Sequence, residues 1–280
     1  MQSNLKMKIA YLIALLASCA LSACTAVPTS AMKDIASNTI AYYFREGQSP
    51  TIVFQSGLGD GKNVWGETLK YLPDSASIFL YDRPGYGGSP ETSDSRDPCA
   101  ISRELNELLQ AVGVSPPYIL VGHSLGGLDQ FYYASIFPDQ VAGLVLLDPT
   151  HPSHWETMQR EAKAQANLIT GLRNVAFSQV MRQEFDDQTG CLNSLNSEKP
   201  NDLPSILLFS GQFQIIEKGS YETMVKKLRK EWRYLLVNSR QSEIANSSHY
   251  IQKDAPEEVA RAIEKMLADY ANNALQRTSR

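Results

Sequence analysis

Short apolar runs alternate with segments of helical periodicity along most of the chain. Runs with the length and residue types of strands occur at 39–45, 51–55, 77–81, 118–121, 142–147, 205–210 and 243–245. Between them, segments such as 97–112 and 125–136 carry apolar residues three and four positions apart, which indicates amphipathic helices. Strands connected by helices form a mostly parallel sheet that is covered on both faces. The pattern therefore predicts an α/β fold with a mostly parallel central sheet.

The alternation is interrupted after the run that ends at residue 147. Residues 150–202 are polar, helical in pattern and without a convincing strand, so we expect a helical insertion there. The folded core is then expected to comprise residues 38–149 and 203–272, and residues 273–280 are expected to be a C-terminal tail. With 280 residues, one domain with an insertion is the natural expectation.

The N-terminus has the features of a bacterial export signal. Lysines precede an apolar run, Ile9–Leu21, which is short for a membrane span. The run ends in Leu-Ser-Ala-Cys at Cys24, which resembles a lipobox and so implies cleavage before Cys24 and lipidation of that residue. Cleavage as an ordinary secretory signal is the alternative. We expect residues 1–24 to be a signal peptide, residues 25–37 a tether, and the protein to be lipid-anchored in the cell envelope, periplasmic or secreted.

A strand and a helix meet almost without a loop around Ser124. The intervening residues are Gly-His-Ser-Leu-Gly-Gly, from Gly122 to Gly127. Glycines on both sides remove the Cβ atoms that would clash in so tight a turn, and they leave the serine hydroxyl next to the first N–H groups of a helix. This is the context of the G-x-S-x-G nucleophile elbow. A phosphate-binding turn is the weaker interpretation, because the glycine signatures of dinucleotide and P-loop sites are missing.

The elbow in this context resembles the α/β-hydrolase fold superfamily. The resemblance extends to Asp82–Ser89 (DRPGYGGS), a loop whose charges we expect to satisfy its own backbone rather than to catalyse. It implies a serine hydrolase that needs no cofactor, with the insertion as a cap over the substrate pocket. His151, His154 and Trp155 could line the mouth of that pocket. No metal site is expected, because no third ligand accompanies the two histidines at a suitable spacing.

The resemblance also implies two main-chain donors for an oxyanion hole. In the superfamily a loop after a central strand, usually His-Gly-x, supplies one of them. Ser56-Gly57-Leu58 stands at that place here, which makes the N–H of Leu58 the candidate. The second candidate is the N–H of Leu125, directly after the serine. A plain turn that uses the same glycines is the alternative.

The remaining catalytic groups are expected from chain order. His249 lies between the last strand and the last helix, where the superfamily keeps its catalytic histidine, and an acid must lie between the serine and this histidine in the chain. Gln214 occupies the place where many relatives carry the acid, and it cannot bear a negative charge. Asp148, at the tip of a buried strand, is the expected acid. Glu217 is the alternative.

Two cysteines remain after the signal peptide and Cys24 are set aside. Cys99 and Cys191 would then be in an oxidising compartment, where they could form a disulfide or stay as buried thiols. A bridge would close a long loop and add about 4 kcal/mol of stability in the chain-entropy model.

Charge adds few functional constraints. The formal net charge is −4 and the basic residues are scattered, so nucleic-acid binding is not expected. On the predicted helix at 221–234, Arg229 and its neighbouring lysines are expected to face solvent.

Small-molecule esters or related acyl compounds are the expected substrates, with cleavage through an acyl-enzyme. Aminopeptidases, thioesterases, lactonases and perhydrolases use the same triad, so they remain alternatives. Epoxide hydrolases and haloalkane dehalogenases need a carboxylate where Ser124 stands. A catalytically inactive scaffold that binds a ligand at the cell surface is the remaining hypothesis, and Gln214 is its best support. Acyl length and oligomeric state are not predicted.

Overall fold

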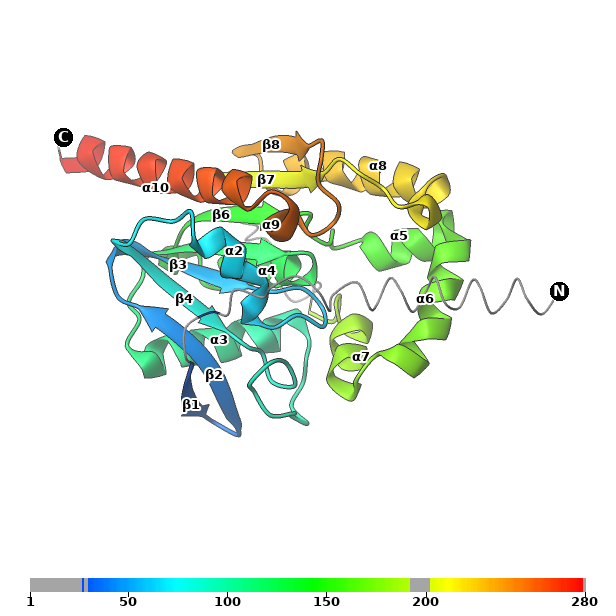
Figure 1. The fold of residues 1–280 in the computed structure, drawn as a ribbon, viewed down its shortest axis with the longest axis horizontal. Helices are drawn as coiled ribbons and strands as arrows, with labels where there is room; N and C mark the ends of the chain where they lie inside the picture. The colour runs from blue at the N-terminus through cyan, green and yellow to red at the C-terminus, as the bar shows by residue number, and fades with distance from the viewer. Residues whose placement is uncertain (1–26, 28–29, 192–201, 279–280) are drawn as a thin grey trace.

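A computed structural model describes residues 27, 30–191 and 202–278 of the chain (Figure 1). In this part the strands form one eight-stranded sheet in the order β1-β2-β4-β3-β5-β6-β7-β8. Neighbours from β4 through β8 run parallel, whereas β2 pairs antiparallel with β4 and β1 pairs antiparallel with β2. The predicted mostly parallel sheet is confirmed. The strands are β1 (Ala31–Ile35), β2 (Asn38–Arg45), β3 (Gln48–Gln55), β4 (Ala76–Tyr81), β5 (Tyr118–His123), β6 (Val141–Leu147), β7 (Ser205–Ser210) and β8 (Ser239–Ile244).

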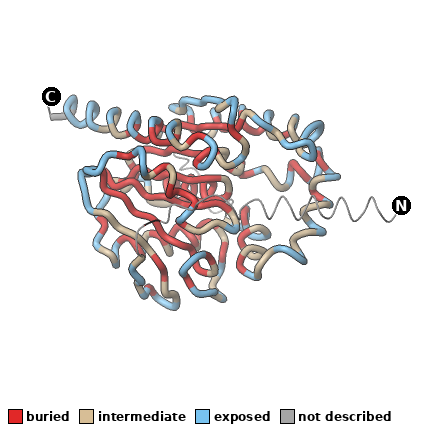
Figure 2. The backbone as a smooth tube through the Cα atoms, in the orientation of Figure 1, coloured by how far each residue is buried: buried red, intermediate tan, exposed pale blue. Residues whose placement is uncertain are grey.

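Helices cover both faces of the sheet, as predicted (Figure 1). One face packs against α3 (Pro98–Val112), α4 (Leu125–Ile136) and α8 (Ser220–Leu235). The other packs against η2 (Lys62–Trp65), α9 (Ile251–Asp254) and α10 (Pro256–Thr278), with α2 (Gly66–Leu69) beside them. Successive residues of a strand face opposite sides of the sheet, so the continuous apolar runs of the central strands make both of their faces apolar. These strands are buried (Figure 2).

The segment between β6 and β7 contains three further helices, α5 (His154–Glu161), α6 (Lys163–Ala176) and α7 (Gln179–Asp186). α5 and α6 pack on α8 through a small apolar cluster of their own, which includes Met158, Ala166 and Leu228. In Figure 1 the three helices lie on the side of the molecule toward which the arrow of β7 points, with α7 farthest from that strand. The segment is helical as expected, although residues 192–201 lie outside the described part. Short 3-10 turns occur at η3 (Pro138–Gln140) and η5 (Ile215–Glu217).

Two predicted boundaries are wrong. Part of the expected tether, residues 25–37, is strand β1, which pairs with β2 from Ala31 to Ile35 and buries Ile35 in the core. Composition suggested a tether, but pairing with a sheet edge satisfies the backbone of even a small, polar segment. The expected tail, residues 273–280, continues α10 to Thr278, because no glycine or proline ends the helix earlier.

The predicted signal peptide and Cys24 lie outside the described residues. None of the helices in the described part of the chain has both the length and the hydrophobicity needed to cross a bilayer.

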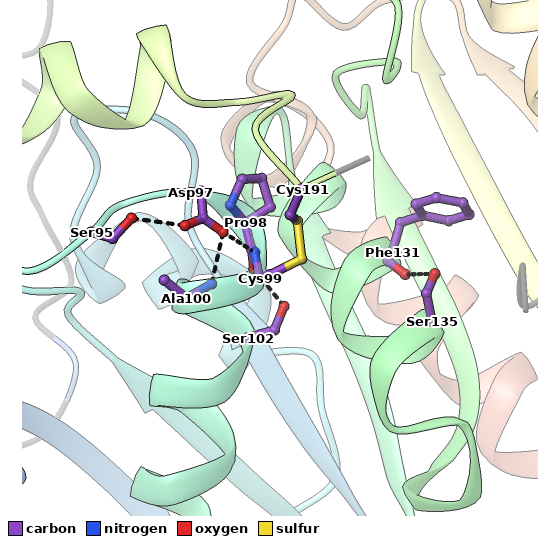
Figure 3. Close-up of a disulfide and its surroundings, with 9 residues drawn as sticks. All are labelled: Ser95, Asp97, Pro98, Cys99, Ala100, Ser102, Phe131, Ser135 and Cys191. Atoms are coloured by element: carbon purple, nitrogen blue, oxygen red, sulfur yellow. Dashed lines mark hydrogen bonds between the residues drawn. A yellow bond between two sulfur atoms is a disulfide. The ribbon is translucent and has the colours of Figure 1, made fainter. Parts of the chain in front are cut away.

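A disulfide joins Cys99, at the start of α3, to Cys191, just after α7 (Figure 3). The two residues are 92 positions apart, so the bond closes a long loop and fastens the end of the helical insertion to the core. The first turn of α3 is set by Asp97, whose carboxylate accepts hydrogen bonds from the N–H groups of Cys99 and Ala100. The disulfide therefore attaches the segment that follows α7 covalently to α3.

Candidate active site

Ser124 lies at a strained turn between β5 and α4. Its φ of 54° and ψ of −121° are in a region that non-glycine residues rarely adopt. The turn is possible because glycines flank it: a Cβ on Gly122 would lie 2.5 Å from the carbonyl oxygen of Gly126, and one on Gly126 would lie 2.3 Å from that of Ser56. The close approaches explain the Gly-x-Ser-x-Gly pattern at this point of the sequence.

The structure brings Ser124, His249 and Asp148 together from distant parts of the chain. The Nε2 atom of His249 lies 3.0 Å from the Oγ of Ser124, and its Nδ1 lies 2.8 Å from a carboxylate oxygen of Asp148. Asp148 directly follows β6, and His249 precedes α9. Because β5 and β6 are parallel neighbours, serine and acid lie at the same edge of the sheet.

Asp148 has a second set of partners that the sequence did not reveal. Its other carboxylate oxygen accepts a hydrogen bond from Arg229 at 2.8 Å, and the hydroxyl of Ser210 donates to the oxygen shared with His249, also at 2.8 Å. Arg229 additionally donates to the backbone carbonyl of Ser210. The prediction that Arg229 faces solvent is therefore wrong, since its side chain is buried against the acid. A helical pattern could not show this, because a cation is expected on a solvated face.

The electrostatics of the pair favour a charged acid and a basic histidine. Burial would raise the pKa of Asp148, but the hydrogen bond from His249 and the positive charge of Arg229 outweigh it and hold that pKa well below its usual range. Partial loss of hydration would lower the pKa of His249, but the hydrogen bond to the Asp148 carboxylate and its negative charge raise it above the ordinary value. The carboxylate is thus ionised and stabilises a proton on the imidazole.

The other acid candidates lie elsewhere. Gln214 precedes the turn η5 and Glu217 is its last residue, and the Glu217 carboxylate accepts a hydrogen bond from the backbone N–H of Gln214 at 2.7 Å. Neither side chain is hydrogen-bonded to His249 in the structure, whereas Asp148 is. Although position 214 carries a glutamine, His249 still has a carboxylate partner. That partner is Asp148, which follows β6, whereas Gln214 lies after β7.

His123, directly before Ser124 in the chain, contacts the backbone of His249. Its ring is buried, and its Nε2 lies 2.9 Å from the backbone carbonyl oxygen of His249. Burial lowers the pKa of His123 to about 3, so the ring is neutral and Nε2–H is the donor to that carbonyl. His123 therefore fixes the backbone that carries His249. The sequence contains no signal for this role beyond the position of His123 in the elbow.

The loop after β3 faces the serine. A Cβ on Gly57 would lie 3.2 Å from the Cβ of Ser124, so this stretch of backbone is next to the elbow. Leu58 follows it, and Leu125 is the first residue of α4, where no intrahelical acceptor is available for its N–H. Both predicted oxyanion donors are thus on segments that adjoin Ser124.

Arg83 ties this loop to the helical insertion. Its guanidinium donates to the backbone carbonyls of Ser56 at 2.6 Å and Gly57 at 3.0 Å. The same group forms two hydrogen bonds, at 3.0 and 2.9 Å, with the carboxylate of Glu184 on α7. Arg96 also pairs with Glu184, at 3.3 Å. All three charged side chains are buried, so the loop next to the serine is braced by ion pairs in a dry environment.

Asp82 has the structural role expected for it. Its carboxylate accepts hydrogen bonds from the ammonium and the backbone N–H of Lys62, both at 2.6 Å, and from the N–H of Gly88 at 2.9 Å. These contacts hold the loop after β4 in place, away from the serine.

Glu184→Gln is expected to lower the free energy of unfolding by about 3–5 kcal/mol, because it leaves Arg83 buried without a carboxylate partner and leaves Arg96 with Glu104 alone. Urea unfolding at neutral pH measures the change. Glu161→Gln is the control, since Glu161 pairs with Lys227 at the surface and its loss should matter little. Equal stability of the two variants would show that the buried cluster contributes no more than a surface pair.

A cavity of about 120 Å³ opens beside Ser124. His151, His154 and Tyr221 line it, together with parts of Asp148 and Arg229. It is smaller than typical ligand pockets of roughly 300–1,000 Å³. His151 and His154 therefore lie at the site as predicted, whereas Trp155 packs against Phe185 of α7.

Metal ligands are not grouped at this site in the described residues. Among those residues the group of three potential ligands is Asp97, Cys99 and Cys191, and the two sulfur atoms of that group are bonded to each other. That group therefore offers no thiolates.

Comparison with known proteins identifies the family. Residues 50–197 match the model of the alpha/beta hydrolase fold. The chain is 30% identical over 234 residues to Uncharacterized protein YqjL of Bacillus subtilis (strain 168), which covers 78% of this chain and 84% of that protein. The chain belongs to the alpha/beta hydrolase fold family.

Relatives of this alpha/beta hydrolase differ in chemistry. The human Monoacylglycerol lipase ABHD6 is 31% identical over 109 residues, 38% of this chain and about a third (32%) of that protein. A membrane phospholipase A has the same fold with a TM-score of 0.64 at 21% identity, covering 97% of this chain and all of that one (100%). A haloalkane dehalogenase variant from Bradyrhizobium elkanii gives 0.67 at 17% identity, covering 89% and 99%. The fold alone therefore does not select a reaction.

Proposed function

We propose that this alpha/beta hydrolase is a serine esterase that cleaves a carboxylic ester of a small molecule through an acyl-enzyme. The observation that carries the proposal is the continuous chain of hydrogen bonds from the Oγ of Ser124 through His249 to Asp148. A serine is weakly nucleophilic by itself, and a neighbouring base that is oriented by a third group activates it. The lipases among the relatives support ester chemistry.

In the proposed mechanism the Oγ of Ser124 attacks the ester carbonyl while Nε2 of His249 takes the hydroxyl proton. The negative oxygen of the tetrahedral intermediate is bound by the N–H groups of Leu58 and Leu125. His249 then gives its proton to the leaving alcohol, and the acyl group stays on the serine. Water, deprotonated by the same imidazole, releases the acid and restores the enzyme. Asp148 holds the imidazole tautomer with the proton on Nδ1 and stabilises the imidazolium.

The arrangement argues against the inactive-scaffold alternative. That hypothesis drew on Gln214, which cannot provide a negative charge. Asp148 provides one at hydrogen-bond distance from His249, and the strained backbone at Ser124 is maintained at a cost to stability. Amide, thioester, lactone and peracid chemistry use the same groups, and we propose the ester on the strength of the relatives.

A fluorophosphonate probe tests the proposal directly. The probe phosphonylates only serines that are activated by a base, so we expect one label per chain on the peptide that contains Ser124. Mass spectrometry of the labelled protein locates the adduct, and heat-denatured protein is the control. Absence of labelling in the folded protein, or labelling elsewhere, would refute the proposed function.

The activity should rise with pH through a value above the ordinary histidine pKa. His249 can accept the serine proton only when it is neutral, and its pKa is raised by the Asp148 carboxylate. The acidic limb of kcat/KM is therefore expected above about pH 6.5. Hydrolysis of p-nitrophenyl butyrate across pH 5–9 at constant ionic strength measures it. A limb at or below pH 6.5 would contradict the raised pKa.

We also propose that the protein is exported and carried on a membrane by lipid on Cys24, with α5–α7 as a cap over the site. The lipobox-like sequence supports the first part. Two placements support the second part. α5 lies beside the cavity at Ser124, and α7 is joined through Arg83 to the loop after β3.

A further inference from the structure

The cavity beside Ser124 contains a polar group that the proposed mechanism does not use. His151 lines this cavity and is only 7% exposed, and its Nε2 atom is itself closed to solvent and has no hydrogen-bond partner among the described residues. A buried polar atom without a partner costs about 1–3 kcal/mol, so its retention calls for an explanation. The rings of His151 and Trp232 pack at a steep angle, 78°, with their centroids 5.5 Å apart, and the only polar atom of the Trp232 side chain is a donor.

The tautomer of His151 follows from its other nitrogen. The backbone N–H of Ser153 donates to Nδ1 of His151 at 3.1 Å, so Nδ1 carries no proton. Burial lowers the pKa of His151 to about 4, so the ring is neutral near pH 7. The single ring proton is then on Nε2. His151 is therefore a cavity-lining residue with a buried hydrogen-bond donor that is not used.

The other lining groups make the cavity polar, and they leave no unpaired charge while His249, which also lines it, is in the neutral form that accepts the serine proton. Burial lowers the pKa of His154 to about 4 and raises that of the Tyr221 hydroxyl, so both are neutral near pH 7. The negative charge of Asp148 is balanced by Arg229, with which it forms an ion pair. A substrate carboxylate would find no free cation here, and an ammonium group would find no free anion. The cavity suits a neutral oxygen acceptor.

We propose that His151 determines specificity by donating a hydrogen bond from Nε2 to an ether, hydroxyl or carbonyl oxygen in a short, uncharged part of the ester. The inference rests on the proposed esterase function and names its substrate class. The small volume of the cavity admits a short group, and the donor favours an oxygenated group over a hydrocarbon of equal size. Either the acyl or the alcohol part of the ester can occupy the cavity, and the experiment distinguishes them.

Matched esters that differ by one oxygen test the proposal. The acyl pair is p-nitrophenyl methoxyacetate and p-nitrophenyl butyrate, and the alcohol pair is 2-methoxyethyl acetate and butyl acetate. For each pair, kcat/KM for the oxygenated ester is divided by that for the hydrocarbon ester. Comparing this ratio between wild type and His151→Phe cancels intrinsic reactivity. We expect the ratio to fall about three- to tenfold in one of the two pairs, which corresponds to the loss of one neutral hydrogen bond.

Two further variants repeat the test with a polar side chain at position 151, where His151→Phe introduces an apolar one. His151→Asn keeps an acceptor for the Ser153 N–H but is too short to place a donor at the Nε2 position, whereas the amide of His151→Gln reaches it. We expect the ratio to fall in His151→Asn and to recover at least partly in His151→Gln. Tyr234→Phe, which alters an exposed tyrosine on α8, should leave the ratio unchanged.

The outcomes separate the two proposals. If wild type hydrolyses the esters and neither ratio changes in His151→Phe or His151→Asn, the role of His151 is refuted while the esterase function stands. If wild type hydrolyses none of the esters and the fluorophosphonate does not label Ser124, the esterase function fails and the substrate preference fails with it.

Discussion

Ser124→Ala is expected to lower kcat for ester hydrolysis by about a million-fold and to abolish fluorophosphonate labelling. The attacking oxygen would be lost, and His249 would face a methyl group in place of the hydroxyl that lies 3.0 Å from its Nε2. The residual rate should reflect substrate binding and the oxyanion donors alone. The fold should persist, because the substitution removes a single oxygen at the surface of the cavity.

Single-turnover and steady-state hydrolysis of p-nitrophenyl butyrate measure this loss, with thermal unfolding as a check on the fold. Ser135→Ala is the matched control. Ser135 lies near the other end of the same helix, α4, where its hydroxyl donates to the backbone carbonyl of Phe131, as Figure 3 shows. That variant should keep its activity. Substantial turnover by Ser124→Ala would mean that another group is the nucleophile.

Asp148→Asn is expected to lower kcat by about ten thousand-fold. An amide cannot stabilise the imidazolium, and it can donate to Nδ1 of His249, which would favour the tautomer that cannot accept the serine proton. The same change leaves Arg229 buried without its negative partner. We therefore also expect the acidic limb of the pH profile to move to lower pH, because the charge that raises the pKa of His249 is gone.

Glu217→Gln is the decisive control for this second prediction. Glu217 is the other carboxylate that chain order allows as the acid, and its side chain caps the turn at Gln214 rather than binding His249. We expect kcat to change little in this variant. Measurement of kcat and of the pH profile for both variants assigns the acid. A large loss in Glu217→Gln with a small one in Asp148→Asn would reverse the assignment.

Local pattern was enough for the fold class and for the main candidate residues. The apolar runs and the helical periodicity around them specify a parallel sheet, because the central strands of such a sheet are apolar on both faces. The glycines around Ser124 mark a turn that has few other uses, since their missing Cβ atoms are needed for specific close contacts. The position of His249 between the last strand and the last helix then identified it as the expected catalytic histidine. These features depend on neighbours in the sequence, which is why they could be predicted.

Contacts between distant segments were decided only by the tertiary structure. Asp148 was one of two possible acids until the packing of β6, β7 and α8 placed it between His249 and Arg229. Arg229 could not be recognised in advance, because a buried cation on a helix has the same local pattern as an exposed one. The brace from Arg83 to Glu184 spans 101 positions.

The sequence by itself determined the α/β fold, the elbow at Ser124 and the place of His249, because backbone geometry and hydrophobic periodicity are local properties. The tertiary structure decided which carboxylate meets the histidine and which charges are buried. It also decided that His151, which lines a small polar cavity, has a buried donor without a partner in the described part of the chain. Those properties depend on desolvation and on distances across the fold, which no stretch of sequence contains.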